Sequence, residues 1–393
     1  MAATAEPVAR RQRRPLPPWA VFLGGQTAAL IAAFLFAGLV GSLIILAYHE
    51  SPLRVYETVW RFSTARPSDF ARVLVNATPL IFSGLALAVA FKAGMFNIGV
   101  EGQYIVALMT ASAAAITLKF FPAVVLLPAV VLAAVIGSTA WAAVPAILKV
   151  KTGAHEVVTT IMMNGIALSL VGWALLKPLK THEVGLIDLR TDIFTTKALI
   201  PKLAPALGLG SSIPSSIALT WLFPVALLTC VGVWFLLYRT RLGYEVRAVG
   251  SSAGSAEAGG VPIGATQLKI FLISGALAGF VGLNNLLGDR GYLGNNYEIG
   301  LGFAGIAVAF LGRNHPFGIP LAAILIGLLQ RGQDGLAVTT NIPTEILIIL
   351  QGVLILSVVV AYELVNRAII RRRQRLVRSE ETGPGDRASG EVT

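Results

Sequence analysis

The stretch FKAGMFNIGVEGQY, residues 91–104, puts a lysine, an asparagine, a glutamate and a glutamine into a chain that is otherwise strongly apolar. Asn97 and Glu101 are four residues apart, so they lie on one face if the stretch is helical. The glycines between and beside them permit a close helix contact or a break in the helix. The stretch therefore predicts a polar, irregular element inside an apolar fold.

The composition of the chain is that of a polytopic membrane protein. Of 393 residues, 55% are hydrophobic and 13% are charged, which is about half the charged share of a typical soluble domain. Residues 19–48 contain no Asp, Glu, Lys or Arg, and about 20 apolar residues are enough to cross a bilayer. This run is roughly twice as long as the core of a signal peptide, so we expect it to form a retained first span.

The apolar runs predict an all-α polytopic membrane fold with about ten transmembrane helices, some of them broken or half-helices. The two short runs near residues 299–332 are the expected half-helices. The predicted spans are 20–47, 72–91, 93–118, 122–148, 155–177, 217–238, 267–288, 299–312, 318–332 and 343–363.

The net charge of +11 is gathered toward the two ends of the chain, with arginines before the first span and after the last. Excess Lys and Arg near span ends marks the cytoplasmic side, so we expect both termini in the cytoplasm and no binding of nucleic acid. The predicted parts are a basic segment at 1–18, a transmembrane domain at 19–363 with an extracytoplasmic loop at 178–216 and a cytoplasmic loop at 239–266, and a basic, partly disordered tail at 364–393.

The polar residues in the apolar runs have two interpretations. A carboxylate inside a membrane costs at least a few kcal/mol unless it faces protein or water. Glu101 therefore either lines a translocation path or accepts hydrogen bonds from backbone N–H groups freed at a helix break. Residues spaced by four in 156–164 form a polar stripe that lines a pore or bonds to neighbouring helices. The candidate residues for the path or the helix break are Asn97, Glu101, Gln103, Glu156, Thr160 and Asn164.

Two loops carry further candidates. In 239–266, Ser252 or Ser255 can cap a short helix that ends before Gly259, and this helix either docks a cytoplasmic partner or simply connects two spans. At the expected outer mouth, a polar cluster either binds a solute or partner or is a solvated loop. Its residues are Asn295, Asn296 and Tyr297.

The chain has no phosphate-binding loop of the G-x-x-x-x-G-K-[ST] type and no G-x-S-x-G motif, and its four histidines do not cluster in sequence. We therefore expect no catalytic residue, no metal site and no cofactor. ATP hydrolysis, where needed, belongs to another subunit.

Four segments together resemble a known family. They are FNIGVEGQ at 96–103, HEVVTTIMMNGIA at 155–167, LGYEVRAVGSSAGSAEAGGV at 242–261 and GFAGIAVAFLGRNHPFGI at 302–319. They resemble the permease subunits of bacterial ABC importers for nucleosides, simple sugars or purines, within the branched-chain amino acid and ribose permease superfamily. His155 is a departure, because asparagine more usually stands at that position.

This resemblance implies a ten-span, type II-like importer permease in the bacterial cytoplasmic membrane. The implied partners are ABC ATPase subunits inside, a second permease in a heterodimer, an extracytoplasmic solute-binding protein, membrane lipid and a small-molecule solute. It also implies that the 242–261 segment contacts the ATPase. The residues expected at that contact are Gly243, Arg247, Gly250, Glu257, Ala258 and Gly259.

The sequence is also compatible with two other functions. An ion-coupled secondary transporter would use Glu101 as its proton site. A membrane-embedded enzyme would need converging His, Asp or Glu residues, whereas the sequence shows only scattered ones.

Overall fold

In the computed structural model, residues 35–36, 38–183, 188–339, 348–349, 352–353, 356–357 and 360 are described. The chain forms two units, residues 48–351 and residues 1–47 with 352–393. A short apolar helix, Gly38–Ala47, belongs to the latter unit. The predicted segments 1–18 and 364–393 lie outside the described residues, as do more than half of the first predicted span and most of the last.

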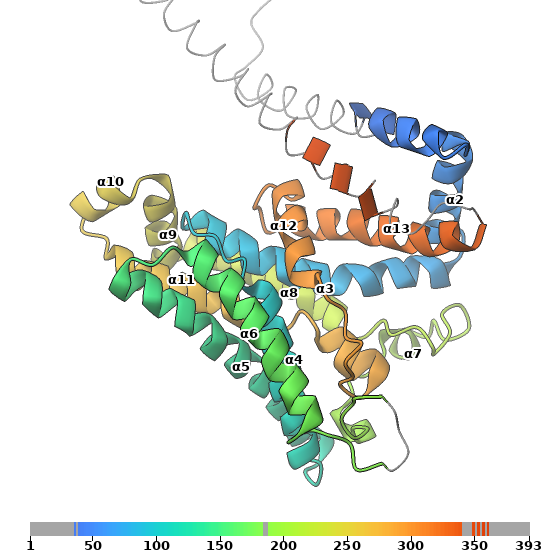
Figure 1. The fold of residues 1–393 in the computed structure, drawn as a ribbon, viewed down its shortest axis with the longest axis horizontal. Helices are drawn as coiled ribbons and strands as arrows, with labels where there is room; N and C mark the ends of the chain where they lie inside the picture. The colour runs from blue at the N-terminus through green and yellow to red at the C-terminus, as the bar shows by residue number, and fades with distance from the viewer. Residues whose placement is uncertain are drawn as a thin grey trace, which may run out of the picture. The chain divides into compact units, whose positions relative to one another are not determined.

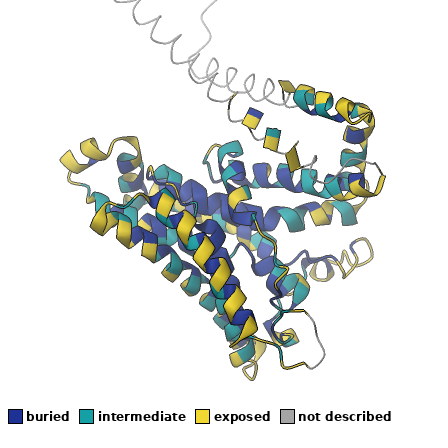
Figure 2. Ribbon diagram, in the orientation of Figure 1, coloured by how far each residue is buried: buried dark blue, intermediate teal, exposed yellow. Residues whose placement is uncertain are grey.

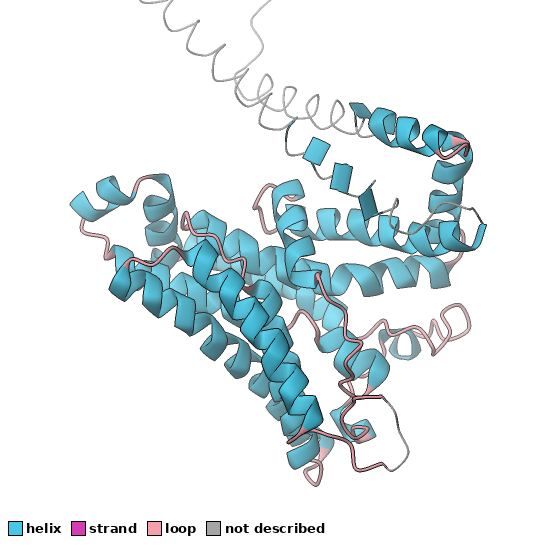
Figure 3. Ribbon diagram, viewed as in Figure 1, coloured by secondary structure: helices cyan, strands magenta, loops and turns pink. Residues whose placement is uncertain are grey.

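The regular structure of the described part of residues 48–351 is helical apart from two isolated bridges, as Figure 3 shows. The elements are α2 Pro52–Thr64, α3 Pro67–Lys92, α4 Val100–Thr117, α5 Ala123–Thr152, α6 Glu156–Leu176, η1 Thr196–Ala198, α7 Leu203–Ala206, α8 Leu222–Arg239, α9 Arg241–Ser251, α10 Ala253–Ala258, α11 Ile263–Ala278, the π-helix η2 Asn284–Arg290, α12 Leu301–Leu311 and α13 Gly318–Thr339.

Four of these helices, α3, α5, α6 and α8, are long and apolar enough to cross a membrane, and α11 and α12 are shorter apolar helices. The predicted all-α polytopic fold is therefore confirmed for the described residues. On α5 and α6, large apolar side chains remain exposed, among them Ile136 at 58% and Met162 at 64%. Exposed apolar faces of this extent are what a lipid-facing helix presents.

Helix α3 is the centre of this unit. Every residue from Ala77 to Ala90 is buried, so this part of α3 is surrounded by protein on all sides. Helices α8, α11, α12 and α13 pack against it, and Figures 1 and 2 show α3 beside α12 and α13 and dark blue along this part. At Gly305 of α12 and Gly327 of α13, an added Cβ would overlap Ser83 and the Val73 carbonyl of α3. These two glycines therefore let α12 and α13 approach α3 closely.

The break expected near FKAGMFNIGVEGQY lies at residues 93–99, between α3 and α4. The Met95 N–H donates to the Ala90 carbonyl and the Gly94 N–H to the Phe91 carbonyl, the two bonds of a Schellman ending. Gly94 has φ +70°, a left-handed conformation that favours glycine. The predicted span 93–118 is consequently seven residues too long at its start, since α4 begins at Val100.

Other boundaries also differ from the prediction. Helices α2 and α9 were not predicted, because both are short and only one-sidedly apolar. The expected span 267–288 is interrupted after Ala278 and resumes as η2, and the expected span 318–332 continues to Thr339 in α13. The short helix predicted near Ser252 is confirmed as α10, with the Ser255 N–H donating to the Ser252 hydroxyl.

Candidate functional site

The side chains of Asn97 and Gln103 form a buried amide pair at the α3–α4 break. Each donates to the other, at 3.0 and 2.9 Å. Asn97 also donates to the Ser274 hydroxyl of α11 at 2.8 Å, and that hydroxyl donates to the Ala86 carbonyl of α3 at 2.6 Å. These side chains are at most 1% exposed. The network therefore fixes the break to α3, α4 and α11 and leaves these amides no open space to line.

Glu101 is 1% exposed and lies against the start of α12. The Gly300 and Gly302 N–H groups donate to its carboxylate at 2.7 and 2.8 Å, and the Tyr104 hydroxyl donates at 3.2 Å. The first N–H groups of a helix have no partner within the helix, and a carboxylate there is favoured by the helix dipole. Glu101 thus accepts hydrogen bonds from free backbone N–H groups, as the second interpretation of its role predicts. Those N–H groups belong to the start of α12.

The polar stripe of α6 faces α4 and the α3–α4 break. Asn164 accepts from the Gly102 N–H at 2.9 Å and donates to the Ile98 carbonyl at 3.1 Å. Thr160 donates to the Glu156 carbonyl at 2.7 Å within its own helix. Asn164 thus bonds to the backbone of α4 and of the α3–α4 break, whereas Thr160 bonds within α6.

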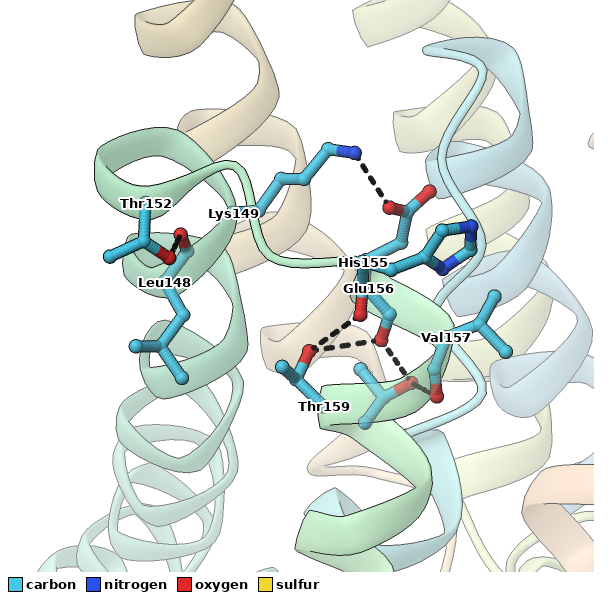
Figure 4. A network of polar contacts seen from close by, with 8 residues as sticks. Leu148, Lys149, Thr152, His155, Glu156, Val157 and Thr159 are labelled. Atoms are coloured by element: carbon cyan, nitrogen blue, oxygen red, sulfur yellow. Dashed lines mark hydrogen bonds and ion pairs between the residues drawn. The ribbon is translucent and has the colours of Figure 1, made fainter.

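The α5–α6 corner contains an ion pair. Figure 4 shows the Lys149 ammonium reaching the Glu156 carboxylate, at 2.9 Å. His155 precedes α6, where its side chain makes no capping hydrogen bond. Its ring is exposed.

The predicted ATPase-contact residues divide into two groups. Gly243 and Gly250 face their own chain, since a Cβ at either would overlap the backbone of α8 or the end of α3. The Arg247 guanidinium donates to the Leu237 carbonyl and lies 5.3 Å from the centre of the Tyr238 ring. Glu257, Ala258 and Gly259, at the end of α10, are exposed.

The predicted outer-mouth residues lie in the loop between η2 and α12. Asn295 and Asn296 are exposed. Arg290 donates to the carbonyl and to the side-chain oxygen of Asn296, both at 2.8 Å, and the Asn295 N–H donates to the Leu189 carbonyl at 2.9 Å. Tyr297 is partly buried beside a small cavity of about 20 Å³. Hydrogen bonds to Arg290 and to the Leu189 carbonyl therefore fix the position of this loop.

Three open cavities along α3 and α13 were missed by the sequence reasoning. The first, of about 470 Å³, is the basic cavity, because Arg61, Arg66 and Arg331 line it with Asp69 as its described acid. The second, of about 190 Å³, is the mixed-charge cavity and contains three arginines and three acids. The third, of about 380 Å³, is the carboxylate cavity. Its polar lining residues are Asn76, Asn285, Glu298, Gln330, Gln333 and Asp334.

These cavities adjoin one another, since the first two share Arg331 and the last two share five lining residues. Arg331 forms ion pairs with Asp69 of α3 at 2.9 Å and with Asp334 of its own helix at 3.1 Å. The lining residues of α13 are three and four apart, so they share one helix face. The run QRGQDG at 330–335, polar within an apolar helix, was the available sequence signal.

Membrane-length helices around the buried part of α3 define a multi-pass membrane protein, and adjoining polar cavities lie along α3 and α13. The family described as "branched-chain amino acid transport system / permease component" matches residues 70–359, and the chain belongs to this family. It is therefore a permease component, a transport subunit rather than an enzyme, and the family-level resemblance of its four motifs is confirmed.

Three relatives match over most of their length. The glucose ABC transporter permease protein TsgB13 of Haloferax volcanii is 30% identical, covering 88% of this chain and 89% of that protein. The guanosine ABC transporter permease protein NupP of Bacillus subtilis is 33% identical, covering 82% and 90%. The nucleoside ABC transporter permease protein NupB of Lactococcus lactis is 28% identical, covering 84% and 90%.

Proposed function

We propose that this chain is the permease subunit of an ATP-driven ABC importer that moves a nucleoside-like solute, or a related sugar or purine, across the bacterial cytoplasmic membrane. The family supports the permease role. Relatives named for guanosine, nucleosides and glucose support a hydroxylated solute. Both termini are placed in the cytoplasm, as the charge distribution at the chain ends suggests.

The observation that carries the choice of solute is the polar lining of the carboxylate cavity. Its volume of about 380 Å³ falls within the common range of ligand sites, roughly 300–1,000 Å³. Side-chain amides and carboxylates line it, and these bind hydroxyl and ring N–H groups. A branched-chain amino acid would place an apolar side chain against them and leave their hydrogen bonds unmade. A sugar or nucleoside suits this lining better.

Energy from ATP enters, in this proposal, through α9 and α10. Glu257, Ala258 and Gly259 at the end of α10 are exposed and can contact an ATPase subunit. Gly250, which has no side chain, lets α9 pack directly on the end of α3. A change in the docked ATPase therefore reaches α3, which lines the solute cavity. A second permease and an extracytoplasmic binding protein complete the proposed assembly.

The ion-coupled alternative requires Glu101 to exchange protons with water. The buried carboxylate instead holds three hydrogen-bond donors, two of them backbone groups of α12. Losing its charge would weaken the bonds that hold the start of α12. This geometry favours the ATP-driven proposal.

The test is uptake into proteoliposomes. The permease pair, reconstituted with its ATPase and binding protein, is expected to take up guanosine or glucose only when ATP is supplied to the ATPase side. Uptake driven by a pH gradient, in vesicles lacking both the ATPase and the binding protein, would overturn the proposal in favour of a secondary transporter.

A further inference from the structure

The carboxylate cavity differs in charge from its two neighbours. Among its described lining residues are Glu298 and Asp334 but no lysine or arginine. The mixed-charge cavity beside it balances three acids with three arginines, and the basic cavity beyond has three arginines to one acid. Both acids also line the mixed-charge cavity, where Asp334 pairs with Arg331 and Glu298 lies near Arg290. A solute in the carboxylate cavity therefore meets side-chain amides and two carboxylates that have arginine partners on their other side.

Both carboxylates are positioned by partners on one side and reach the cavity on the other. Asp334 is held by Arg331 at 3.1 Å, yet its side chain is 64% exposed. Glu298 accepts a hydrogen bond from the Asn285 side chain and is also exposed. An ionised carboxylate has about four acceptor sites, so each retains acceptor capacity toward the cavity.

We infer that the carboxylate cavity binds an uncharged solute through neighbouring hydroxyl groups, with Glu298 and Asp334 as hydrogen-bond acceptors. Hydroxyl groups donating to carboxylates form charge-assisted hydrogen bonds. The inference rests on the proposed function and makes these two acids specificity-determining residues.

The test compares substrates in the complete transporter with Glu298→Gln and Asp334→Asn. The uptake of guanosine is compared with that of 2′,3′-dideoxyguanosine. The binding protein is the same in every sample, so a change in the uptake ratio belongs to the permease. Asp69→Asn is the matched control, because it also removes one carboxylate from Arg331 but lies in the basic cavity.

The wild type is expected to prefer guanosine. Each cavity variant should reduce that preference by about tenfold, the effect of losing one charge-assisted hydrogen bond. The Asp69→Asn ratio should stay within about twofold of wild type. Wild-type ratios in both cavity variants, with uptake still measurable, would overturn the inference.

Failure of the proposed function has a different signature. If the wild type takes up neither guanosine nor glucose with ATP, the proposed function itself is wrong. If it takes up glucose alone, the same ratio is measured with glucose and 2-deoxyglucose, which lacks one of the neighbouring hydroxyls.

If both variants lose all uptake while solute-free ATPase activity persists, the acids are required for the solute, as inferred. If that activity is lost as well, labelled guanosine or glucose binding to the purified permease supplies the ratio.

Discussion

Glu101 holds the start of α12 through the Gly300 and Gly302 N–H groups. In Glu101→Gln, one oxygen is replaced by an NH₂ group that faces a backbone donor, so a buried N–H loses its acceptor. We expect the free energy of unfolding to fall by about 1–3 kcal/mol. Thermal unfolding of the purified protein measures this. A Gln variant as stable as wild type would show that the carboxylate is not needed there.

At the residue scale, the sequence located the important polar side chains but could not say what they face. Glu101 was predicted to be costly and partnered, yet its partners lie 199 and 201 residues away in the chain. The spacing of Asn164 put it on a polar stripe, while its contact with Gly102 required the α4–α6 packing. Asn76 was missed because a single amide in an apolar span does not differ in sequence from one that bonds within its own helix. Gln330 was missed although it belongs to the polar run at 330–335.

Helix α9 is attached to the end of α3 at Gly250, where an added Cβ would overlap the Lys92 carbonyl oxygen. Gly250→Ala is expected to destabilise the protein by about 1–3 kcal/mol, the usual effect of overpacking. Gly254→Ala on α10 is the matched control, since nothing lies within 4 Å of a Cβ added there. Because alanine has a higher helix propensity than glycine, Gly254→Ala should leave the free energy of unfolding unchanged or raise it by up to about 1 kcal/mol. Equal thermal unfolding of the two variants would contradict this contact.

The turn between α12 and α13 is expected to make stability depend on pH. Burial, followed by the positive charges of Lys92 and Arg313, lowers the pKa of His315 from its usual 6.5. The unfolded chain therefore binds a proton more readily, and the free energy of unfolding falls as pH drops below 6.5 and levels off below the folded-state pKa. As the pH is lowered from about 7.5 to 5, the unfolding temperature of His315→Gln should fall less steeply than that of the wild type. Identical pH profiles would refute the prediction.

At the element scale, apolar runs predicted the existence of the long helices and missed their ends. Helix α4 begins seven residues late because Gly94 and the amide pair of Asn97 and Gln103 stabilise a non-helical segment. Helix α9 was missed because its apolar side packs on the protein and its other side is polar, a pattern that run length does not detect. The Ser252 cap of α10 was local, and it was predicted correctly.

At the scale of the whole molecule, the proposed sidedness places α10 inside and the η2–α12 loop outside. Cys230 is the chain's one cysteine and is 2% exposed, so introduced cysteines can be labelled over a low background. A membrane-impermeant maleimide is expected to label Asn295→Cys in intact cells and Glu257→Cys in inside-out vesicles. Labelling of both positions from the same side would contradict the proposed orientation.

The central claim, that solute passes through the carboxylate cavity, is tested most directly at Gln330. In the complete transporter, a small thiol reagent should block ATP-driven uptake by Gln330→Cys, and excess solute should slow the block. Val338→Cys, 82% exposed on the same helix but outside the lining of that cavity, should keep its uptake after labelling. Full labelling of Gln330→Cys with unchanged uptake would contradict the claim.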